Sequence, residues 1–425
     1  MKLKIVLIGA GSISFGRGTL ADIFNSKEIE SIDTTIYLVD INKSSLNRIY
    51  KLANLFKEYF KSNIKIKATT NRIEALKNAD FVITSVAKKR YELWEQDFKI
   101  PLSYGFKHCL GENGGPGALF HALRNFEIMI PIAVDMEKLC PSAFLLNYTN
   151  PESRVVMAIR NLTSIQAIGL CHGAIGCLYS VCGLLNKKYT ELEMVTGGLN
   201  HFLFLTKVID KKTGKDLYPT LRKIILNNPK SAPPLVRKMV EIFGLYTYPS
   251  DDHIGEYLSF AYHFTGTKWR YGRGFQKQQN DFLSPYLKGI KKIDNEILHP
   301  TCELAIPIIL DIVFDRKKWE YAVNVPNDKL YVENLPRDAI VEVPAIVDRK
   351  GIHPQKIGAL PEALACYCRT QISIQKLIVE AYKKKSKNLL LQALLLDPVV
   401  NNVEKAEKML DKMLKLQSSF LPKFN

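Results

Sequence analysis

The segment KIVLIGAGSIS (residues 4–14) decides the fold, because an apolar run ends there in a glycine turn. The uninterrupted apolar residues predict a strand that is buried on both faces of a parallel sheet. Gly9 permits a tight turn, and Gly11 lets the backbone approach a pyrophosphate at the start of the next helix. Ser12 and Ser14 continue this turn, and Ser14 is small enough for the helix to pack on the strand. The segment therefore predicts a dinucleotide-binding unit.

The second predicted strand, TTIYLVDI (residues 34–41), ends in Asp40. A carboxylate at this position can accept hydrogen bonds from an adenosine ribose and would repel a 2′-phosphate. The alternative is a glycine turn that only connects a strand to a helix. The strand, the helix and Asp40 together favour NAD as the cofactor.

Strands and helices alternate along the first 170 residues. Further apolar strands are predicted at 64–70, 79–87, 143–151 and 167–171, with helices at 41–60 and 117–141 among the segments between strands. This order predicts an α/β fold with a Rossmann-type doubly wound parallel sheet. Two strands within 191–210 and long amphipathic helices within 360–398 predict a mixed α+β region after it.

Composition excludes several classes of protein. The chain has 425 residues and a net charge of +17, but its lysines are dispersed and no nucleic-acid motif is visible, so nucleic acid is not expected as a partner. No apolar run is long enough for a membrane helix, and the N-terminus is interpreted as a strand rather than a signal peptide. The eight cysteines are scattered, which favours reduced thiols and a cytoplasmic location.

Polar residues occur in a glycine-rich loop that precedes a predicted helix and at the end of a predicted strand. Glu112 and Asn113 lie in the glycine-rich loop GENGGPG, and Asn150 lies in NYTNP at a strand end. The carboxyl ends of parallel strands face the ligand crevice, so these side chains are predicted to contact substrate. Each segment can instead be a structural turn.

A thiol and an imidazole occur at two other turns, in GLCHG (169–173) and GGLNHFLFL (197–205). Cys171 and His201 are too few ligands for a structural zinc site, but substrate and water can complete a site for a divalent ion such as manganese. Asn200, beside His201, is a further candidate for substrate binding. The alternative is a cysteine packed as a small hydrophobe and a histidine satisfied in the core.

Together these segments resemble glycoside hydrolase family 4, the NAD- and metal-dependent glycosidases related to lactate and malate dehydrogenases. NLPRDAIVEVP (334–344) and GALP (358–361) extend the resemblance over most of the chain. It implies that Cys171 and His201 hold the metal, commonly manganese, and that Asn150 contacts sugar hydroxyls beside it. The implied reaction is NAD-mediated oxidation at C3, deprotonation at C2, elimination at C1 and addition of water, after which the hydride returns to C3.

The resemblance also indicates where the acid and base lie. His172 occupies the position at which the 6-phospho-α-glucosidase branch has an acidic aspartate; alternatively, His172 only hydrogen-bonds substrate or a neighbouring loop. The base is expected in GLYTYPSDDHIGEY (244–257). Its D-x-H spacing with His253 favours Asp251 among the candidates Tyr246, Tyr248, Asp251 and Asp252.

The sugar is predicted from the residue after the metal cysteine. CHG resembles the branches that act on non-phosphorylated α-glycosides, and Arg270 and Arg273 would suit a sugar carboxylate. We therefore expect α-glucuronides or α-galacturonides first, and α-glucosides or α-galactosides second. An NAD-dependent 2-hydroxy acid dehydrogenase of the lactate/malate type is the alternative from another class, although it gives Cys171 and His201 no role.

The chain is expected to divide into two domains. Residues 1–195 would bind NAD, and residues 196–425 would bind substrate, complete the metal site and form the oligomer. Apolar helix faces in the second part predict a homodimer or homotetramer, as in the family. The expected partner of both domains is a small glycoside.

Overall fold

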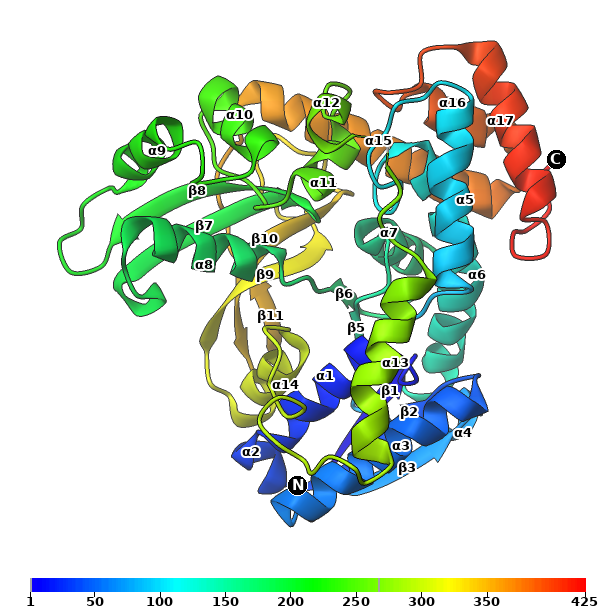
Figure 1. Cartoon of the computed structure of the whole chain (residues 1–425), viewed down its shortest axis with the longest axis vertical. Coiled ribbons are helices and arrows are strands. Elements are labelled where there is room, and N and C mark those ends of the chain that lie inside the picture. Colours follow the sequence, from blue (N-terminus) through cyan, green and yellow to red (C-terminus); the bar gives the residue numbers. More distant parts are fainter. Residues whose placement is uncertain (1, 267) are drawn as a thin grey trace.

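The computed structural model describes residues 2–266 and 268–425, except for the side chains of residues 273, 275 and 276. Within these residues, eleven strands form one continuous sheet (Figure 1). They are β1 (Lys2–Ile8), β2 (Asp33–Val39), β3 (Lys65–Thr69), β4 (Phe81–Thr84), β5 (Phe144–Asn147), β6 (Ala167–Gly169), β7 (Leu192–Leu199), β8 (Phe202–Asp210), β9 (Lys318–Pro326), β10 (Ile340–Asp348) and β11 (Gly351–Pro354).

The first half of the sheet is parallel, in the order β3-β2-β1-β4-β5-β6. This is the strand order of a doubly wound nucleotide-binding fold, so the predicted Rossmann-type sheet is confirmed. Alternate residues of β1 enter two different cores: Ile5 and Leu7 belong to one, and Val6 and Ile8 to the other. Burial on both faces is the reason why this strand is a continuous apolar run.

The second half of the sheet is antiparallel and joins the first through one pair, Gly169 of β6 and Asn324 of β9. From there the order is β9-β10-β7-β8, and β11 pairs with the outer part of β10. Residue 195, where the sequence predicts the division into two domains, lies inside β7. The sheet therefore continues across this position, and the two-domain division remains a prediction.

Helices cover both faces of the sheet and its far end (Figure 1). Those of the first part are α1 (Ile13–Phe24), α2 (Lys27–Glu30), α3 (Lys43–Phe60), α4 (Arg72–Leu76), α5 (Arg90–Ser103), α6 (Gly115–Leu139), α7 (Glu152–Leu162) and α8 (Gly173–Leu185). Those of the second part are α9 (Tyr218–Asn227), α10 (Pro234–Phe243), α11 (Asp251–Ile254), α12 (Tyr262–Thr265), α13 (Arg273–Leu287), α14 (Ala305–Phe314), α15 (Glu362–Lys384), α16 (Lys387–Leu395) and α17 (Val403–Leu416). Two 3₁₀ turns, η1 (Tyr189–Glu191) and η2 (Gly255–Tyr257), complete the elements.

A buried ion pair fastens the C-terminal helices to the first half of the chain. Arg124 of α6 lies 2.5 Å from Asp97 of α5, and both side chains are almost fully buried. Gln417, which follows α17, accepts from Arg124 and donates to Asp97. Truncating one partner of such a pair costs about 3–5 kcal/mol, because the other charge stays buried.

No helix in the described part of the chain is both long enough and apolar enough to cross a membrane.

Candidate active site

The turn between β1 and α1 brings the predicted NAD-binding residues together. Gly9 has φ +88°, and a Cβ there would lie 2.0 Å from the carbonyl oxygen of Ser85. Gly11 donates its backbone N–H to Asp40 Oδ2 at 2.9 Å, and a Cβ on Gly11 would lie 2.6 Å from that oxygen. Because only glycine fits at either position, the backbone is free to approach a ligand closely.

Two serines lie at the start of the helix that follows this turn. Ser12 is the N-cap of α1 and accepts from the N–H of Phe15 at 3.4 Å, with the Ser14 hydroxyl 3.4 Å from its own. Free N–H groups and the helix dipole favour an anion at such an N-terminus. Asp40, at the end of β2, lies directly beside the turn. This glycine cradle with an adjacent carboxylate fits the pyrophosphate and ribose of NAD.

Cys171 lies just after β6, at the carboxyl end of the parallel strands, and His201 lies in the turn between β7 and β8. Cys171 follows β6 and is 8% exposed, and burial raises the pKa of its thiol well above the usual value. His201 lies in the two-residue turn between β7 and β8 with φ +61°, a conformation that is uncommon outside glycine and is often found at functional sites.

Tyr248 packs against Gly173, two residues after Cys171, and against His201. A Cβ on Gly173 would lie 2.1 Å from the Tyr248 ring, and the ring centroid of Tyr248 is 5.4 Å from that of His201. His253 lies 4.6 Å from His201 between ring centroids and stacks on Tyr248 at 4.8 Å. Burial lowers the pKa of His201 well below its usual value, so its imidazole is neutral.

The site offers one sulfur ligand, one nitrogen ligand and several oxygen atoms. Among residues 2–266 and 268–425, no three His, Cys, Asp or Glu side chains gather as a complete metal site. Residues that adjoin or hydrogen-bond this group carry buried oxygens without a hydrogen-bond partner in this part of the chain, among them Asn200 Oδ1, Glu303 Oε2 and Glu342 Oε1. A thiol, a neutral imidazole and unpaired oxygens form a donor set that fits a divalent cation completed by substrate.

Asn200 is held by buried polar groups beneath the crevice. Its Nδ2 donates to Glu342 Oε2 at 3.1 Å, and Asn324 donates to the same oxygen at 3.0 Å. Burial raises the pKa of Glu342 to about 7. Asn200 is 3% exposed, so its side chain supports the turn that carries His201.

His172 differs from its neighbour Cys171 in its environment. Its side chain is 59% exposed, and its Nδ1 lies 3.0 Å from Glu303 Oε1. The hydrogen bond with Glu303 raises the pKa of His172 above the ordinary histidine value. A partly exposed imidazole at the rim of the crevice can exchange a proton with substrate.

Tyr246 and Asp251, two predicted catalytic residues, do not join this group. The Tyr246 hydroxyl lies 2.7 Å from that of Ser180 on α8, and the Tyr246 ring is fully buried in the core. Asp251 Oδ1 accepts from the N–H of Val236 and caps α10. The catalytic roles of Tyr246 and Asp251 therefore stay predictions from the sequence, and neither side chain contacts Cys171 or His201 by a hydrogen bond in the described part of the chain.

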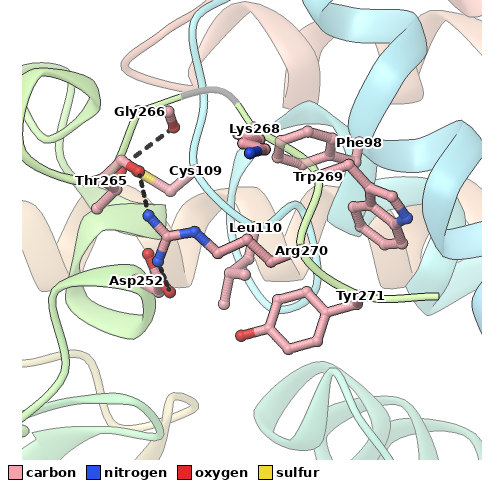
Figure 2. Close-up of a pocket in the computed structure, with 10 residues that line it drawn as sticks. All are labelled: Phe98, Cys109, Leu110, Asp252, Thr265, Gly266, Lys268, Trp269, Arg270 and Tyr271. Atoms are coloured by element: carbon pink, nitrogen blue, oxygen red, sulfur yellow. Dashed lines mark hydrogen bonds and ion pairs between the residues drawn. The ribbon is translucent and has the colours of Figure 1, made fainter. Parts of the chain in front are cut away.

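Asp252 lines the pocket shown in Figure 2. Its carboxylate lies 3.4 Å from Arg270, whose guanidinium also donates to the carbonyl of Thr265 at 3.1 Å (Figure 2). Asp252 also interacts electrostatically with His253, which packs against His201. An aspartate at this place can accept a proton from a ligand that lies beside it.

The predicted substrate residues Glu112 and Asn150 contact each other. Asn150 Nδ2 donates to Glu112 Oε1 at 3.4 Å, and Arg90 donates to the same oxygen at 2.7 Å. Asn113 turns toward the metal candidates, with its Nδ2 3.1 Å from His201 Nδ1. The loop that carries Glu112 and Asn113 therefore contacts both the predicted substrate residue Asn150 and the predicted metal ligand His201.

Aromatic rings form the wall beside Arg270. Tyr271 stacks on Trp94 at 4.6 Å between ring centroids, and Trp269 meets Trp94 edge-on at 5.2 Å. Figure 2 shows Trp269 beside Phe98 and the hydroxyl of Tyr271 directed below Arg270. The guanidinium of Arg270, which the sequence suggests for binding a sugar carboxylate, is thus already paired with Asp252. The side chain of Arg273, the second arginine of that prediction, lies outside the described residues.

Several functional residues were missed from the sequence. Glu303 and Arg90 lie outside the quoted motifs, whereas Glu256 and Glu342 lie inside the segments 244–257 and 334–344 and were not predicted as site residues. In NLPRDAIVEVP, the only sequence signal for Glu342 is that a glutamate occurs inside an apolar strand. Glu303 carries no local signal.

Comparisons with known proteins agree with this geometry. The sequence model described as Family 4 glycosyl hydrolase matches residues 4–187, and that of the C-terminal domain of family 4 glycosyl hydrolases matches residues 196–400. An alpha-glucosidase of Erwinia rhapontici is 33% identical, and an alpha-galactosidase of Bacillus subtilis (strain 168) is 29% identical, each over 99% of both chains. A 6-phospho-alpha-glucosidase from gut microorganisms, solved with NAD and Mn²⁺, has the same fold, with a TM-score of 0.86 at 23% identity over 100% of both chains.

Proposed function

This chain belongs to family 4 of the glycoside hydrolases, and we propose that it hydrolyses non-phosphorylated α-glycosides with NAD and a divalent metal such as Mn²⁺. The observation that carries the proposal is that Tyr248 packs on both the turn after Cys171, at Gly173, and the ring of His201. The family assignment makes the protein a glycosidase and leaves the dehydrogenase alternative without support.

The chain has residues to hold both groups. Gly9, Gly11, Ser12, Ser14 and Asp40 would hold NAD in the first turn, and Cys171 and His201 would hold the metal. When bound, these groups supply hydride exchange with a sugar carbon and polarisation of a sugar carbonyl. The fit rests on the glycine cradle and on the unpaired buried oxygens.

We assign the base to Asp252 and not to Tyr248. A carboxylate beside a guanidinium is an anion and can take the C2 proton of the sugar, whereas burial raises the pKa of Tyr248 and keeps its hydroxyl protonated. Tyr248 instead packs against both metal candidates and has no hydrogen-bond partner in the described part of the chain, so its hydroxyl can donate to a sugar oxygen.

We assign the acid to His172. Its ion pair with Glu303 holds the ring at the rim of the crevice and stabilises its protonated form. A protonated imidazole there can donate to the oxygen of the leaving group. Asn150 and Glu112, which contact each other, would orient sugar hydroxyls beside the metal.

For the sugar, we propose a neutral hexose, an α-glucoside or an α-galactoside. The two relatives described above carry these activities in their names, and Arg270 is neutralised by Asp252. The prediction of α-glucuronides or α-galacturonides from the sequence depends on a free guanidinium, and it remains a prediction. An uncharged hydroxymethyl group requires no such cation.

The experiment is release of p-nitrophenol from its α-glucoside, α-galactoside, α-glucuronide and α-galacturonide. Each is measured with and without NAD, Mn²⁺ and a reductant that keeps Cys171 as a thiol. We expect release from a neutral glycoside only when NAD and Mn²⁺ are both present, with no accumulation of NADH. Release that ignores both cofactors would overturn the mechanism, and faster release from a uronide would overturn the choice of sugar.

A further inference from the structure

The turn η2 connects the two sides of the candidate metal site. Glu256 Oε1 accepts from the backbone N–H of Glu112 at 2.6 Å and of Asn113 at 2.9 Å. The next residue, Tyr257, donates its hydroxyl to the carbonyl of Asn200 at 3.1 Å. Adjacent residues therefore hold the loop that carries Asn113 and the turn that carries His201, and so fix one relative to the other.

The loop lies unusually close to this turn. A Cβ on Gly114 would lie 2.5 Å from the carbonyl oxygen of Glu256, so only glycine permits the contact. Glu256 is 3% exposed, and its Oε2 has no partner among the described residues. A buried carboxylate is costly unless its hydrogen bonds are made. The two hydrogen bonds to the loop amides therefore fix the position of the Glu256 carboxylate.

Asn113 and His201 form a contact that decides which ring nitrogen is free. The two side chains are 4% and 5% exposed, and Asn113 Nδ2 lies 3.1 Å from His201 Nδ1. Because Nδ1 is occupied by Asn113, Nε2 is the nitrogen left for a metal. A ligating nitrogen must carry a lone pair, so in that state the proton must lie on Nδ1.

When Nδ1 of His201 carries the proton, Asn113 must present a hydrogen-bond acceptor to it. The amide provides one when it is turned by 180°, since Oδ1 and Nδ2 then exchange places. Asn113 Oδ1 has no partner in the described part of the chain, so the turn breaks no hydrogen bond at that atom. Nδ2 then faces away from His201, where it can donate to substrate.

We propose that Asn113 and Glu256 are positioning residues for the metal ligand His201. The side-chain carbonyl of Asn113 accepts from His201 Nδ1–H and leaves Nε2 for the metal, while Glu256 holds the Asn113 loop at the distance this bond needs. The inference rests on the metal site of the proposed function, and it goes beyond that site by assigning the residues that orient its histidine.

The experiment measures the Mn²⁺ affinity of the full chain by electron paramagnetic resonance of free Mn²⁺, without substrate. Asn113→Leu removes the hydrogen bond, and we expect affinity to fall 10–100-fold, as is usual when a residue behind a metal ligand is lost. Asn113→Asp retains an acceptor and loses the donor, so affinity should stay equal or become tighter. Loss in Asn113→Asp similar to that in Asn113→Leu would show that the amide donates, and would overturn the proposed orientation.

Glu256 is tested with a matched pair of variants. Glu256→Gln keeps a side-chain oxygen that can accept from both loop amides, so Mn²⁺ affinity should stay within about 3-fold of the wild type. Glu256→Ala removes the acceptor, and affinity should fall 10–100-fold while NAD affinity, set by the distant β1–α1 turn, is unchanged. Equal Mn²⁺ affinity in the Gln and Ala variants would overturn the role of Glu256.

His201→Ala separates the inference from the function on which it rests. If the wild type binds no Mn²⁺, or if His201→Ala binds it as tightly, the proposed metal site itself is wrong. If His201→Ala loses Mn²⁺ and the variants of Asn113 and Glu256 do not, only the positioning role is wrong.

Discussion

His172 and Glu303 form an ion pair of 3.0 Å between the residue after β6 and a segment 131 residues later. The side chain of His172 is 59% exposed, whereas the neighbouring Cys171 is 8% exposed. Two adjacent residues thus have different environments: the thiol of the proposed metal ligand is buried, and the imidazole of the proposed acid is partly exposed and paired with Glu303.

His172→Gln should reduce kcat about 10²–10⁴-fold for an α-linked disaccharide, because its sugar leaving group needs a proton. An α-glycosyl fluoride needs no protonation, so its kcat should change less than about 5-fold. Comparing the two substrates measures acid catalysis directly. Equal losses on both would assign His172 to binding or packing instead.

Asp252→Asn should abolish exchange of the C2 hydrogen of the sugar with solvent deuterium, because the proposed base is lost. Asp251→Asn is the matched control: Asn keeps an oxygen that can accept from the N–H of Val236, so the cap of α10 and the exchange should both stay intact. Mass spectrometry of the sugar recovered from D₂O checks both variants. Exchange that survives in Asp252→Asn and disappears in Asp251→Asn would reverse the assignment.

Cys171→Ser should weaken Mn²⁺ binding by 10-fold or more, because a neutral hydroxyl is a poorer ligand than a thiolate. Cys177→Ser, on α8 and fully buried, should keep Mn²⁺ affinity while losing about 1–3 kcal/mol of stability through burial of a hydroxyl. Metal titration and thermal unfolding of both variants check this contrast. Retained affinity in Cys171→Ser would remove it from the ligand set.

Gly9→Ala should destabilise the protein by about 2 kcal/mol or more and abolish NAD binding, because the new Cβ meets a backbone oxygen at 2.0 Å. Gly183→Ala in α8, where a Cβ meets nothing within 4 Å, should instead stabilise the protein by about 0.5–1 kcal/mol. Urea unfolding and NAD titration measure both effects. A stable, NAD-binding Gly9→Ala variant would contradict the close approach at this turn.

His108 should make stability depend on pH below neutrality. Burial lowers its pKa from 6.5 to about 4, and its Nε2 lies 2.8 Å from the carbonyl oxygen of Phe98. The folded state therefore binds fewer protons than the unfolded state in this range, so the stabilisation is complete above pH 6.5 and is lost as pH falls toward 4. The loss is roughly 3 kcal/mol.

The pH prediction is checked by urea unfolding at several pH values between 7 and 4. His108→Gln, which keeps a donor for the Phe98 carbonyl, should show a shallower loss across the range. His121 and His201, whose pKa values burial also lowers, remain in both proteins as a common background. The same slope in both proteins would show that His108 does not contribute.

The local pattern was sufficient to predict the parallel half of the sheet. In β1, the apolar run 4–8 records burial on both faces, and Gly9 records a backbone shape that other residues rarely adopt. Cys171, His201 and Asn150 were found because each ends a strand or occupies a turn at the crevice. The sequence indicates such positions because backbone geometry restricts the residue types that fit there.

Side-chain direction decided the rest. Tyr246 and Tyr248 have the same type and context in the sequence, yet one enters the core toward Ser180 and the other packs on His201. Asp251 and Asp252 differ in the same way, since one caps α10 and the other pairs with Arg270. The direction of each side chain depends on packing across the chain.

By itself, the sequence determined the family, the Rossmann sheet and the residue types at the strand ends, because these depend on backbone conformation and short-range periodicity. Only the tertiary structure brought Glu256 to Asn113 and Glu303 to His172. Buried carboxylates are placed by contacts between residues more than 100 positions apart, and no local pattern records such contacts.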